Sequence, residues 1–322
     1  MPDGAAALAI GPLGHGCADL GNLYSAMSDE QAHAVLQAAW DCGVRSFDTA
    51  PHYGLGLSER RLGAFLAARP RDEYVVSTKV GRLLRPSPGT AHLQDDVHQF
   101  AVPASLRRVW DTSADGVRRS LAESLERLGL DRVDVLYLHD PEEAGLEASL
   151  ATALPALVGL REQGVVTAVG IGSKSVPALL AGLHTGALDL VMVAGRYTLA
   201  EQPAAQELLP ACRAAGVCVV AAAVYNSGLL SRPAPDTRAR YEYGDVPADV
   251  LAHVRAIERV CAAHGVPLPA AALQFPLRNR VVCSVVVGAA TPEQVRENSA
   301  RLATEVPDSL WDELRRRGLV RG

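Results

Sequence analysis

Short apolar runs alternate with longer amphipathic segments along the chain. The runs are rich in Val and Leu and are continuously apolar, which is typical of parallel strands that are covered on both faces. A weaker strand is predicted at residues 14–17, where glycines interrupt the pattern. The other seven predicted strands lie at residues 46–48, 74–80, 133–138, 165–171, 188–194, 217–222 and 283–287.

Helices are predicted between the strands from their end signals. Ser28, with Gln31 three residues later, forms a capping-box pattern, and Gly43 closes that segment. Residues 113–128 repeat the scheme, with an apolar stripe on one face and Gly129 at the end. Glycines follow three further predicted helices, at Gly164, Gly216 and Gly265. The repeated unit of helix, glycine and strand indicates consecutive βα units.

Eight strands with interleaved helices predict an α/β fold, a (β/α)8 TIM barrel, as a single domain over residues 1–322. A doubly wound sheet is the alternative, but the glycines of residues 11–16 match its dinucleotide-binding turn poorly. One long irregular stretch, residues 82–111, contains three prolines. We expect it to be a loop over the C-terminal face of the barrel, where active sites are built.

Polar side chains stand at or just past the ends of three predicted strands. They are Asp48, Lys79 and His139, and Tyr53 follows Asp48 by five residues. Singly, each has a structural explanation: a helix cap, a solvated lysine or a hydrogen-bonded core imidazole. On one rim of a barrel, however, the four form a coherent acid–base set.

Each of these four residues has a chemical role in such a set. A tyrosine phenol is a weak base at neutral pH, so we expect the ammonium of Lys79 to lower the pKa of Tyr53. Asp48 would keep a buried Lys79 charged, and His139 would orient the reacting oxygen by a hydrogen bond. Such a set moves a proton at a carbon–oxygen centre, and a nicotinamide dinucleotide is the natural hydride partner.

With these motifs the chain resembles the aldo-keto reductase superfamily over essentially its whole length. The resemblance rests on Phe47–Ala50 with Tyr53-Gly54, on Ser77-Thr78-Lys79, on Asp134–His139 and on Gly288–Asn298. It implies a (β/α)8 barrel with a catalytic tetrad of Asp48, Tyr53, Lys79 and His139, in which Tyr53 is the acid–base. Within the superfamily the chain most resembles the aldose 1-dehydrogenase branch and the related pyridoxal 4-dehydrogenases, through segments such as Gly81–Leu84, His139-Asp140-Pro141 and Tyr225–Gly228.

Residues 285–292 read as a strand, a small-residue turn and a helix start, where backbone N–H groups can hold a phosphate. The structural alternative is that Thr291 only caps the helix. The resemblance implies that cofactor contacts come from Ser173, Tyr225, Asn226, Ser227, Gly228, Leu229, Gly288, Ala289, Ala290, Thr291, Gln294, Glu297 and Asn298.

Three positions depart from relatives that bind the 2′-phosphate of NADP. Gly288, Ala290 and Gln294 stand where such relatives often carry basic residues. Without a guanidinium fork a phosphate is poorly held, so NAD is expected in preference to NADP, although Arg296 could supply the charge. Ser173-Lys174 and Ala222 also depart from the usual nicotinamide pocket.

The substrate pocket is predicted from Tyr24, His52, Trp110 and Asp140. Polar groups such as Asp140 and Arg82 could bind sugar hydroxyls. His92 and His98 flank Asp95-Asp96, but their spacing fits no metal motif, so a solvated loop and no metal are expected.

Composition and charge narrow the class of protein further. The formal net charge is −5, which gives no reason to expect a nucleic acid partner, and Arg315–Arg317 is explained as a solvated last helical turn. No apolar run reaches membrane-spanning length and no signal peptide is visible, so a cytoplasmic protein is expected. The six cysteines contain no CxxC pair and are expected to be reduced thiols.

The working hypothesis is oxidation of an aldose at C1 to a lactone. Alternatives are a pyridoxal or modified-sugar dehydrogenase and a general aldehyde or ketone reductase, all using the same tetrad. A nicotinamide-binding regulatory subunit is a more distant alternative. The oligomeric state is not predicted.

Overall fold

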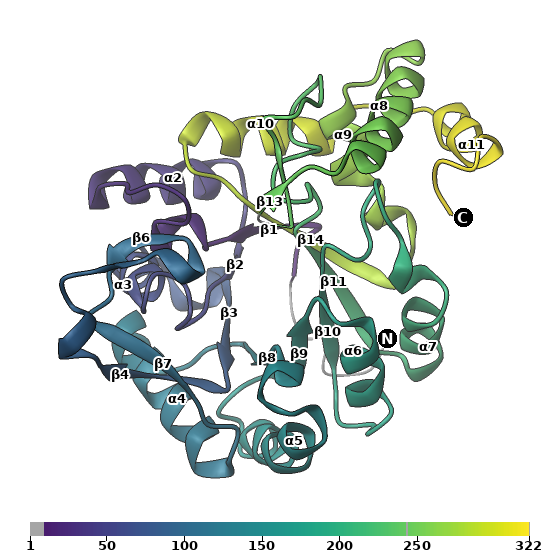
Figure 1. The fold of residues 1–322 in the computed structure, drawn as a ribbon. Helices are drawn as coiled ribbons and strands as arrows, with labels where there is room; N and C mark the ends of the chain where they lie inside the picture. Colours follow the sequence, from purple (N-terminus) through teal and green to yellow (C-terminus); the bar gives the residue numbers. More distant parts are fainter. Residues whose placement is uncertain (1–9, 243, 322) are drawn as a thin grey trace.

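A computed structural model describes residues 10–242 and 244–321 and contains a closed barrel of parallel strands (Figure 1). Around the barrel the strand order is β1, β14, β11, β10, β9, β8, β3, β2. Their bounds are β1 Leu13–Gly16, β2 Ser46–Asp48, β3 Val75–Val80, β8 Val135–His139, β9 Ala168–Ser173, β10 Leu190–Ala194, β11 Cys218–Ala222 and β14 Val282–Gly288. All eight predicted strands are present, including the weak first one, and the TIM-barrel prediction is confirmed.

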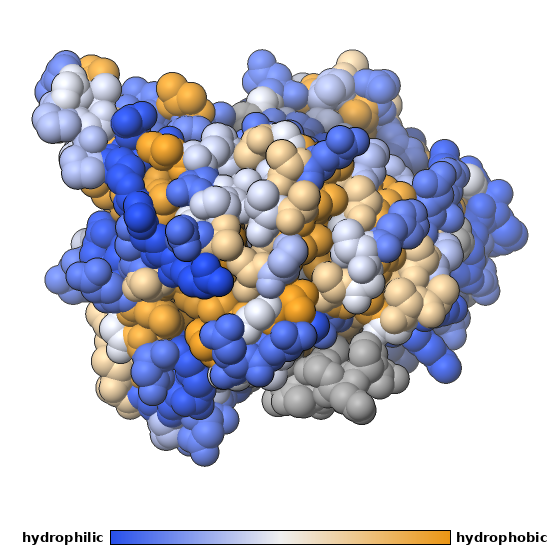
Figure 2. All heavy atoms as spheres, turned by 90° about the horizontal axis from the view of Figure 1, so that it is seen from below, coloured by the Kyte–Doolittle hydropathy of each residue, from blue (hydrophilic) through white to orange (hydrophobic). Residues whose placement is uncertain are grey.

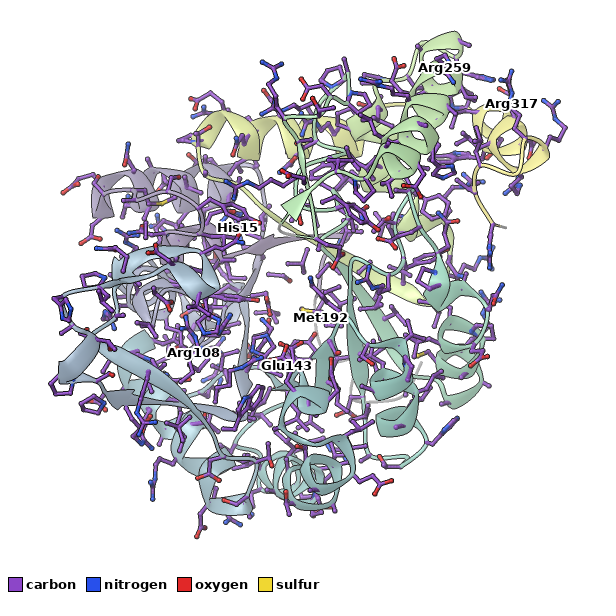
Figure 3. The ribbon with its side chains drawn as sticks, viewed as in Figure 1. His15, Arg108, Glu143, Met192, Arg259 and Arg317 are labelled. Atoms are coloured by element: carbon purple, nitrogen blue, oxygen red, sulfur yellow. A yellow bond between two sulfur atoms is a disulfide. The ribbon has the colours of Figure 1, made fainter. Side chains whose placement is uncertain are left out.

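Helices surround the barrel, as Figure 1 shows. They are α2 Asp29–Asp41, α3 Leu57–Leu66, α4 Ala114–Leu128, α5 Leu146–Glu162, α6 Val176–Leu183, α7 Leu208–Ala215, α8 Ala248–Ala263, α9 Leu268–Gln274, α10 Pro292–Ala303 and α11 Asp308–Arg316. The main apolar core lies between helices and strands, while Tyr137 and Met192 belong to a smaller cluster inside the barrel. Met192 is labelled near the barrel axis in Figure 3.

The predicted helix ends follow the local chemistry. Ser28 Oγ accepts from the Gln31 N–H at 3.2 Å, and Gln31 Oε1 accepts from the Ser28 N–H at 2.7 Å, which completes the capping box. Ser113 caps α4 in the same way, and Gly129 ends it in the left-handed region at φ 63°. Arg315 and Arg316 lie in the last turn of α11, as expected.

The stretch 82–111 is not the irregular loop that was predicted. β4 (Arg82–Pro86) pairs antiparallel with β7 (Leu106–Trp110), and inside this hairpin β5 (Gln94–Asp95) pairs with β6 (Phe100–Pro103). The prolines concealed the pattern, but Pro86 lies at the end of β4 and Pro103 at the end of β6, where strands tolerate them. A second small hairpin, β12 (Arg240–Tyr241) with β13 (Gly244–Asp245), lies between β11 and α8.

The prediction of reduced cysteines was wrong for two of the six. Cys218 and Cys283 form a disulfide, because β11 and β14 are neighbours and bring their Cα atoms to 6.1 Å. Spacing in the sequence carried no sign of this, since 65 residues separate the two. Cys17, Cys42, Cys212 and Cys261 are free thiols.

The outer surface mixes polar and apolar side chains. In Figure 2 hydrophilic residues cover most of the outline, and apolar residues gather nearer the middle of that face. No helix among the described residues is both long and apolar enough to cross a bilayer.

Candidate active site

The barrel brings the predicted polar residues to one mouth. Asp48 and His139 are the last residues of β2 and β8, and Lys79 is the penultimate residue of β3. Because parallel strands of a barrel end on the same face, these three side chains and the loop that carries Tyr53 share one site.

A continuous hydrogen-bond chain joins three of the four residues. Lys79 Nζ donates to Asp48 Oδ2 at 2.6 Å, to the Thr49 carbonyl at 3.0 Å and to Tyr53 Oη at 3.1 Å. Ser77, which sequence reasoning missed, donates from Oγ to Asp48 Oδ1 at 2.7 Å. Both oxygens of Asp48 are therefore occupied, and the Lys79 ammonium is held against the Tyr53 phenol.

The charges of Asp48 and Lys79 correct the expectation for the pKa of Tyr53. Burial alone would lower the pKa of Lys79, but the Asp48 carboxylate and the Tyr53 oxygen outweigh it and raise that pKa. The pKa of Tyr53 is also raised, because burial of the phenol outweighs the opposing effect of Lys79. The prediction that Lys79 lowers the pKa of Tyr53 below its ordinary value was wrong. The main physical reason is the burial of the phenol, and the Asp48 carboxylate raises the pKa of Tyr53 further.

His139 completes the group from the neighbouring strand. Its ring centroid is 6.2 Å from that of Tyr53, in an edge-to-face arrangement. Burial, assisted by the positive charges of Arg82 and Lys79, holds the pKa of His139 well below its ordinary value. The imidazole is therefore neutral near pH 7 and keeps one ring nitrogen as a hydrogen-bond donor.

His52, one of the predicted pocket residues, lies against the same group. Its ring is 5.8 Å from that of His139 and 5.1 Å from that of His98. Arg108 on β7 donates to the His52 carbonyl at 2.7 Å and also pairs with Asp95. Both side chains of that ion pair are only 8% exposed, so the hairpin is anchored to the loop that carries His52.

The buried position of Asp95 corrects the prediction of a solvated loop for Asp95-Asp96. Asp95 is 7% exposed and is paired with Arg108, whereas Asp96 and His92 are exposed. Within the described residues, no group of three His, Cys, Asp or Glu side chains is placed to hold a metal ion.

Asp140 belongs to an ionic cluster beside His139. Arg82 Nη2 donates to Asp140 Oδ2 at 2.9 Å and to Glu143 Oε2 at 3.0 Å. The guanidinium lies 4.1 Å over the Trp110 ring, since Arg82 and Trp110 are register partners in the hairpin. We call Arg82, Asp140 and Glu143 the Arg82 clamp. It brings Trp110 and Asp140, two predicted pocket residues, together.

Tyr24, the remaining predicted pocket residue, links three segments. Its N–H donates to the Gln99 carbonyl at 2.8 Å, and the Arg240 guanidinium lies 4.1 Å from its ring. The backbone of Tyr24 is left-handed, at φ 64°. Tyr24 therefore connects the chain after β1 with both hairpins, although Arg240 was not predicted.

The start of α10 has the predicted cap. Thr291 Oγ1 accepts from the Gln294 N–H at 3.3 Å, and Gln294 Oε1 accepts from the Ala290 N–H at 2.7 Å. Thr291 is thus the N-cap residue, as the structural alternative expected, with Pro292 at the first helical position. Ala289 is buried and joins this turn to Gly288 at the end of β14.

The turn after β11 faces α10. Tyr225 Oη donates to Asn298 Oδ1 at 3.1 Å, and Arg301 reaches the same oxygen at 3.0 Å. Asn226 and Ser227 have positive φ, as does Gly228, so the backbone curls before Leu229. The Oδ1 atom of Asn226 is buried and has no hydrogen-bond partner among the described residues.

These two segments fit a dinucleotide. The turn at Tyr225–Leu229 and the start of α10 are tied together, and the unpartnered Asn226 oxygen can accept a hydrogen bond from a ligand. Glu297 is exposed and accepts from Arg301 at 2.8 Å. Ser173, a predicted cofactor contact, ends β9, and its hydroxyl donates to Glu142.

Asp19 is a further residue that sequence reasoning missed. Burial raises its pKa to about 6. Its Oδ2 atom lies so close to Gly288 that a Cβ at that position would be only 2.4 Å away. The strand-end rule could have found Asp19, but β1 was the weakest of the predicted strands.

Comparison with known proteins finds a matching family and relatives that cover nearly the whole chain. The sequence profile of the Aldo/keto reductase family matches residues 12–317. The chain is 55% identical to a D-threo-aldose 1-dehydrogenase from a Pseudomonas species, over 98% of this chain and 96% of that one. It is 37% identical to a pyridoxal 4-dehydrogenase from Microbacterium luteolum, over 98% and 96%. Among solved structures, an aldo-keto reductase from Bacillus halodurans in holo form has the same fold, with a TM-score of 0.74, 24% identity and coverage of 96% and 92%.

Proposed function

Because the chain belongs to the aldo/keto reductase family of nicotinamide-dependent oxidoreductases, we propose that it oxidises an aldose at C1 to the lactone, with Tyr53 as the acid–base. The observation that carries the proposal is the contact of Lys79 Nζ with Tyr53 Oη at 3.1 Å and with Asp48 Oδ2 at 2.6 Å. The relative at 55% identity, a D-threo-aldose 1-dehydrogenase, supports the choice of substrate class.

The chemistry follows from what these side chains can do. In oxidation the anomeric O–H gives its proton to the Tyr53 oxygen, the C1–H bond breaks with its electron pair, and the C1–O bond becomes the lactone carbonyl. Bound nicotinamide supplies the acceptor for that hydride. Tyr53 must first lose its own proton, and the Lys79 ammonium stabilises the resulting phenolate. In reduction Tyr53 acts as the acid and His139 orients the carbonyl oxygen.

Cofactor choice is proposed to favour NAD over NADP. Gln294 is used to close the turn before α10, and Arg301 is occupied by Glu297 and Asn298. Arg296, 62% exposed, pairs with Glu293. The partly buried carboxylate of Asp19 beside Gly288 adds negative charge near the same turn. A 2′-phosphate would therefore meet carboxylates and occupied guanidinium groups instead of a free fork.

The polar lining of the mouth supports a polyol substrate. His52, Arg82, Asp140 and Glu143 supply hydrogen-bonding groups beside the tetrad, and Trp110 and Tyr24 supply aromatic walls. A second candidate is pyridoxal oxidation, favoured by the relative at 37% identity.

The test is cofactor reduction, followed by absorbance. Purified protein is assayed with L-fucose, D-arabinose, L-galactose, pyridoxal and simple aldehydes, with NAD and NADP in both directions. Turnover of an aldose with NAD supports the proposal. Turnover of pyridoxal or of aldehydes alone favours the second candidate function or a general reductase. Cofactor binding without turnover favours a regulatory subunit.

Tyr53→Phe tests the assignment of the acid–base. We expect kcat to fall by about 10²–10⁴-fold, the usual contribution of a general acid–base, while the dissociation constant for NADH changes little. Tyr197→Phe is the matched control, since Tyr197 is a buried tyrosine packed on Phe275 at 5.4 Å. Turnover of Tyr53→Phe within tenfold of the parent would show that the assignment is wrong.

A further inference from the structure

The Arg82 clamp is built more firmly than a solvated surface ion pair. The Arg82 side chain is 7% exposed and that of Asp140 is 21% exposed, whereas Glu143 is 59% exposed. Trp110 covers the guanidinium from one side. The clamp joins the hairpin that follows β3 to the segment that follows β8. Figure 3 shows Glu143 on the same side of the barrel as Arg108.

The backbone of Asp140 is strained in a way that fixes its side chain. Its φ and ψ are 43° and 56°, in the left-handed region that non-glycine residues seldom adopt. Its N–H donates to the Gly172 carbonyl of β9 at 2.9 Å, which holds the residue in place. Strained backbone of this kind often occurs at functional sites, where the surrounding structure enforces it. Here it sets Asp140 Oδ2 3.4 Å from His139 Nε2.

The clamp leaves hydrogen-bonding capacity unused. Asp140 Oδ2 accepts a hydrogen bond from Arg82. No residue in the described parts of the chain donates to the other oxygen, Asp140 Oδ1. Arg82 Nη1 is buried, and no acceptor reaches it from residues 10–242 or 244–321. A buried donor and a carboxylate acceptor left open beside a reaction centre are best satisfied by a ligand hydroxyl, which both donates and accepts.

The position of Asp140 indicates which hydroxyl this is. The reacting oxygen must lie within hydrogen-bond reach of Tyr53 and His139. Since Asp140 Oδ2 lies 3.4 Å from His139 Nε2, a substrate oxygen bound to that nitrogen brings the substituent on the neighbouring carbon within reach of the carboxylate. In an aldose that group is the C2 hydroxyl. In pyridoxal and simple aldehydes the neighbouring carbon carries no hydroxyl.

We propose that Asp140, held by Arg82, is a specificity-determining residue that accepts a hydrogen bond from the hydroxyl on the carbon next to the reacting carbon. The site thereby selects 2-hydroxy substrates over their deoxy analogues. The identity of the hydroxyl rests on the proposed aldose oxidation. The choice of Asp140 as the residue that binds it rests on the geometry of the Arg82 clamp.

The experiment compares each substrate with its deoxy partner in each variant. kcat/KM is measured for an accepted aldose and its 2-deoxy analogue with NAD, in the parent, Asp140→Asn and the control Glu123→Gln. The parent should disfavour the deoxy sugar by about 10–100-fold, the worth of a hydrogen bond to a charged group. Asp140→Asn should lose most of this ratio. Glu123→Gln, which removes the α4 carboxylate that pairs with Arg85 outside the clamp, should keep it.

Arg82→Gln tests the positioning role of Arg82 with the same readout. Like Asp140→Asn, this variant should have a weaker preference for the 2-hydroxy sugar. A merely structural defect would instead lower kcat/KM for both sugars by the same factor. NADH binding and thermal unfolding of each variant report on folding. A parent enzyme that uses the deoxy sugar as well as the aldose overturns the proposal without any variant.

A second substrate pair separates failure of this inference from failure of the proposed function. Lactaldehyde and propanal differ by one 2-hydroxyl and are reduced with NADH. If no aldose is oxidised, the aldose proposal fails, but a lactaldehyde preference lost in Asp140→Asn still supports the role of Asp140. Equal use of the two aldehydes by the parent, or a preference unchanged in Asp140→Asn, overturns the inference.

Discussion

Removing the charge of Lys79 should destabilise the fold as well as stop catalysis. Lys79 is 2% exposed and Asp48 is 5% exposed, and their closest atoms are 2.6 Å apart. Lys79→Met would leave the Asp48 carboxylate buried with Ser77 Oγ as its remaining side-chain donor. It would also remove the donor to the Thr49 carbonyl.

The magnitude follows from the burial of both partners. Breaking a buried ion pair by removing one partner typically costs about 3–5 kcal/mol, because an uncompensated charge remains. An exposed pair is worth about 0–1 kcal/mol. Arg118, whose side chain is 57% exposed and pairs with Asp115, is the matched control for this difference. Arg118→Met should therefore change the free energy of unfolding by at most about 1 kcal/mol.

The assay measures the free energy of unfolding by denaturant for Lys79→Met, for Asp48→Asn and for the double variant. In Lys79→Met with Asp48→Asn no charge is left buried, so the double variant should lose less than the sum of the single variants by at least about 2 kcal/mol. Turnover should be lost in all three, which separates catalysis from stability. Additive losses, or a loss below about 1 kcal/mol for Lys79→Met, would contradict this prediction.

Four further predictions concern pH, cofactor choice and the hairpin. Because the pKa of Tyr53 is raised, its phenol stays protonated through neutral pH. The rate of reduction should therefore stay constant up to about pH 10, while the rate of oxidation should rise with pH. An oxidation rate that is flat between pH 7 and 9 would contradict this prediction. Because burial holds the pKa of His139 well below its ordinary value, neither direction should show a limb near pH 6.5 in a pH–rate profile. Gln294→Arg should improve the NADP dissociation constant by about tenfold relative to that of NAD, measured by fluorescence titration, with Arg296→Gln expected to change neither. Arg108→Met should release the hairpin from Asp95 and the His52 carbonyl, so limited proteolysis should cut within residues 87–105 faster than in Arg107→Met.

Local patterns in the sequence determined the strands, the helix ends and the grouping of the four polar residues. Continuous apolar runs identify buried parallel strands, and Ser28, Ser113 and Gly129 stabilise helix ends through bonds within a few residues. Because parallel strands end on one face, the positions of Asp48, Lys79 and His139 at predicted strand ends suffice to assign them to one mouth. These features depend on residues that are close in the sequence and on the repeat of apolar strands and helices along the chain.

Contacts between distant segments were decided only by the tertiary structure. The Arg82 clamp and the Arg108–Asp95 pair need the register of the hairpin, and the Cys218–Cys283 disulfide needs β11 beside β14. The sign of the pKa shift of Tyr53 is also a tertiary property, since it is the balance of burial against two opposite charges brought together by different strands. Residue types reveal which charges are available, but only the packed structure sets how far water is excluded and which charges cancel.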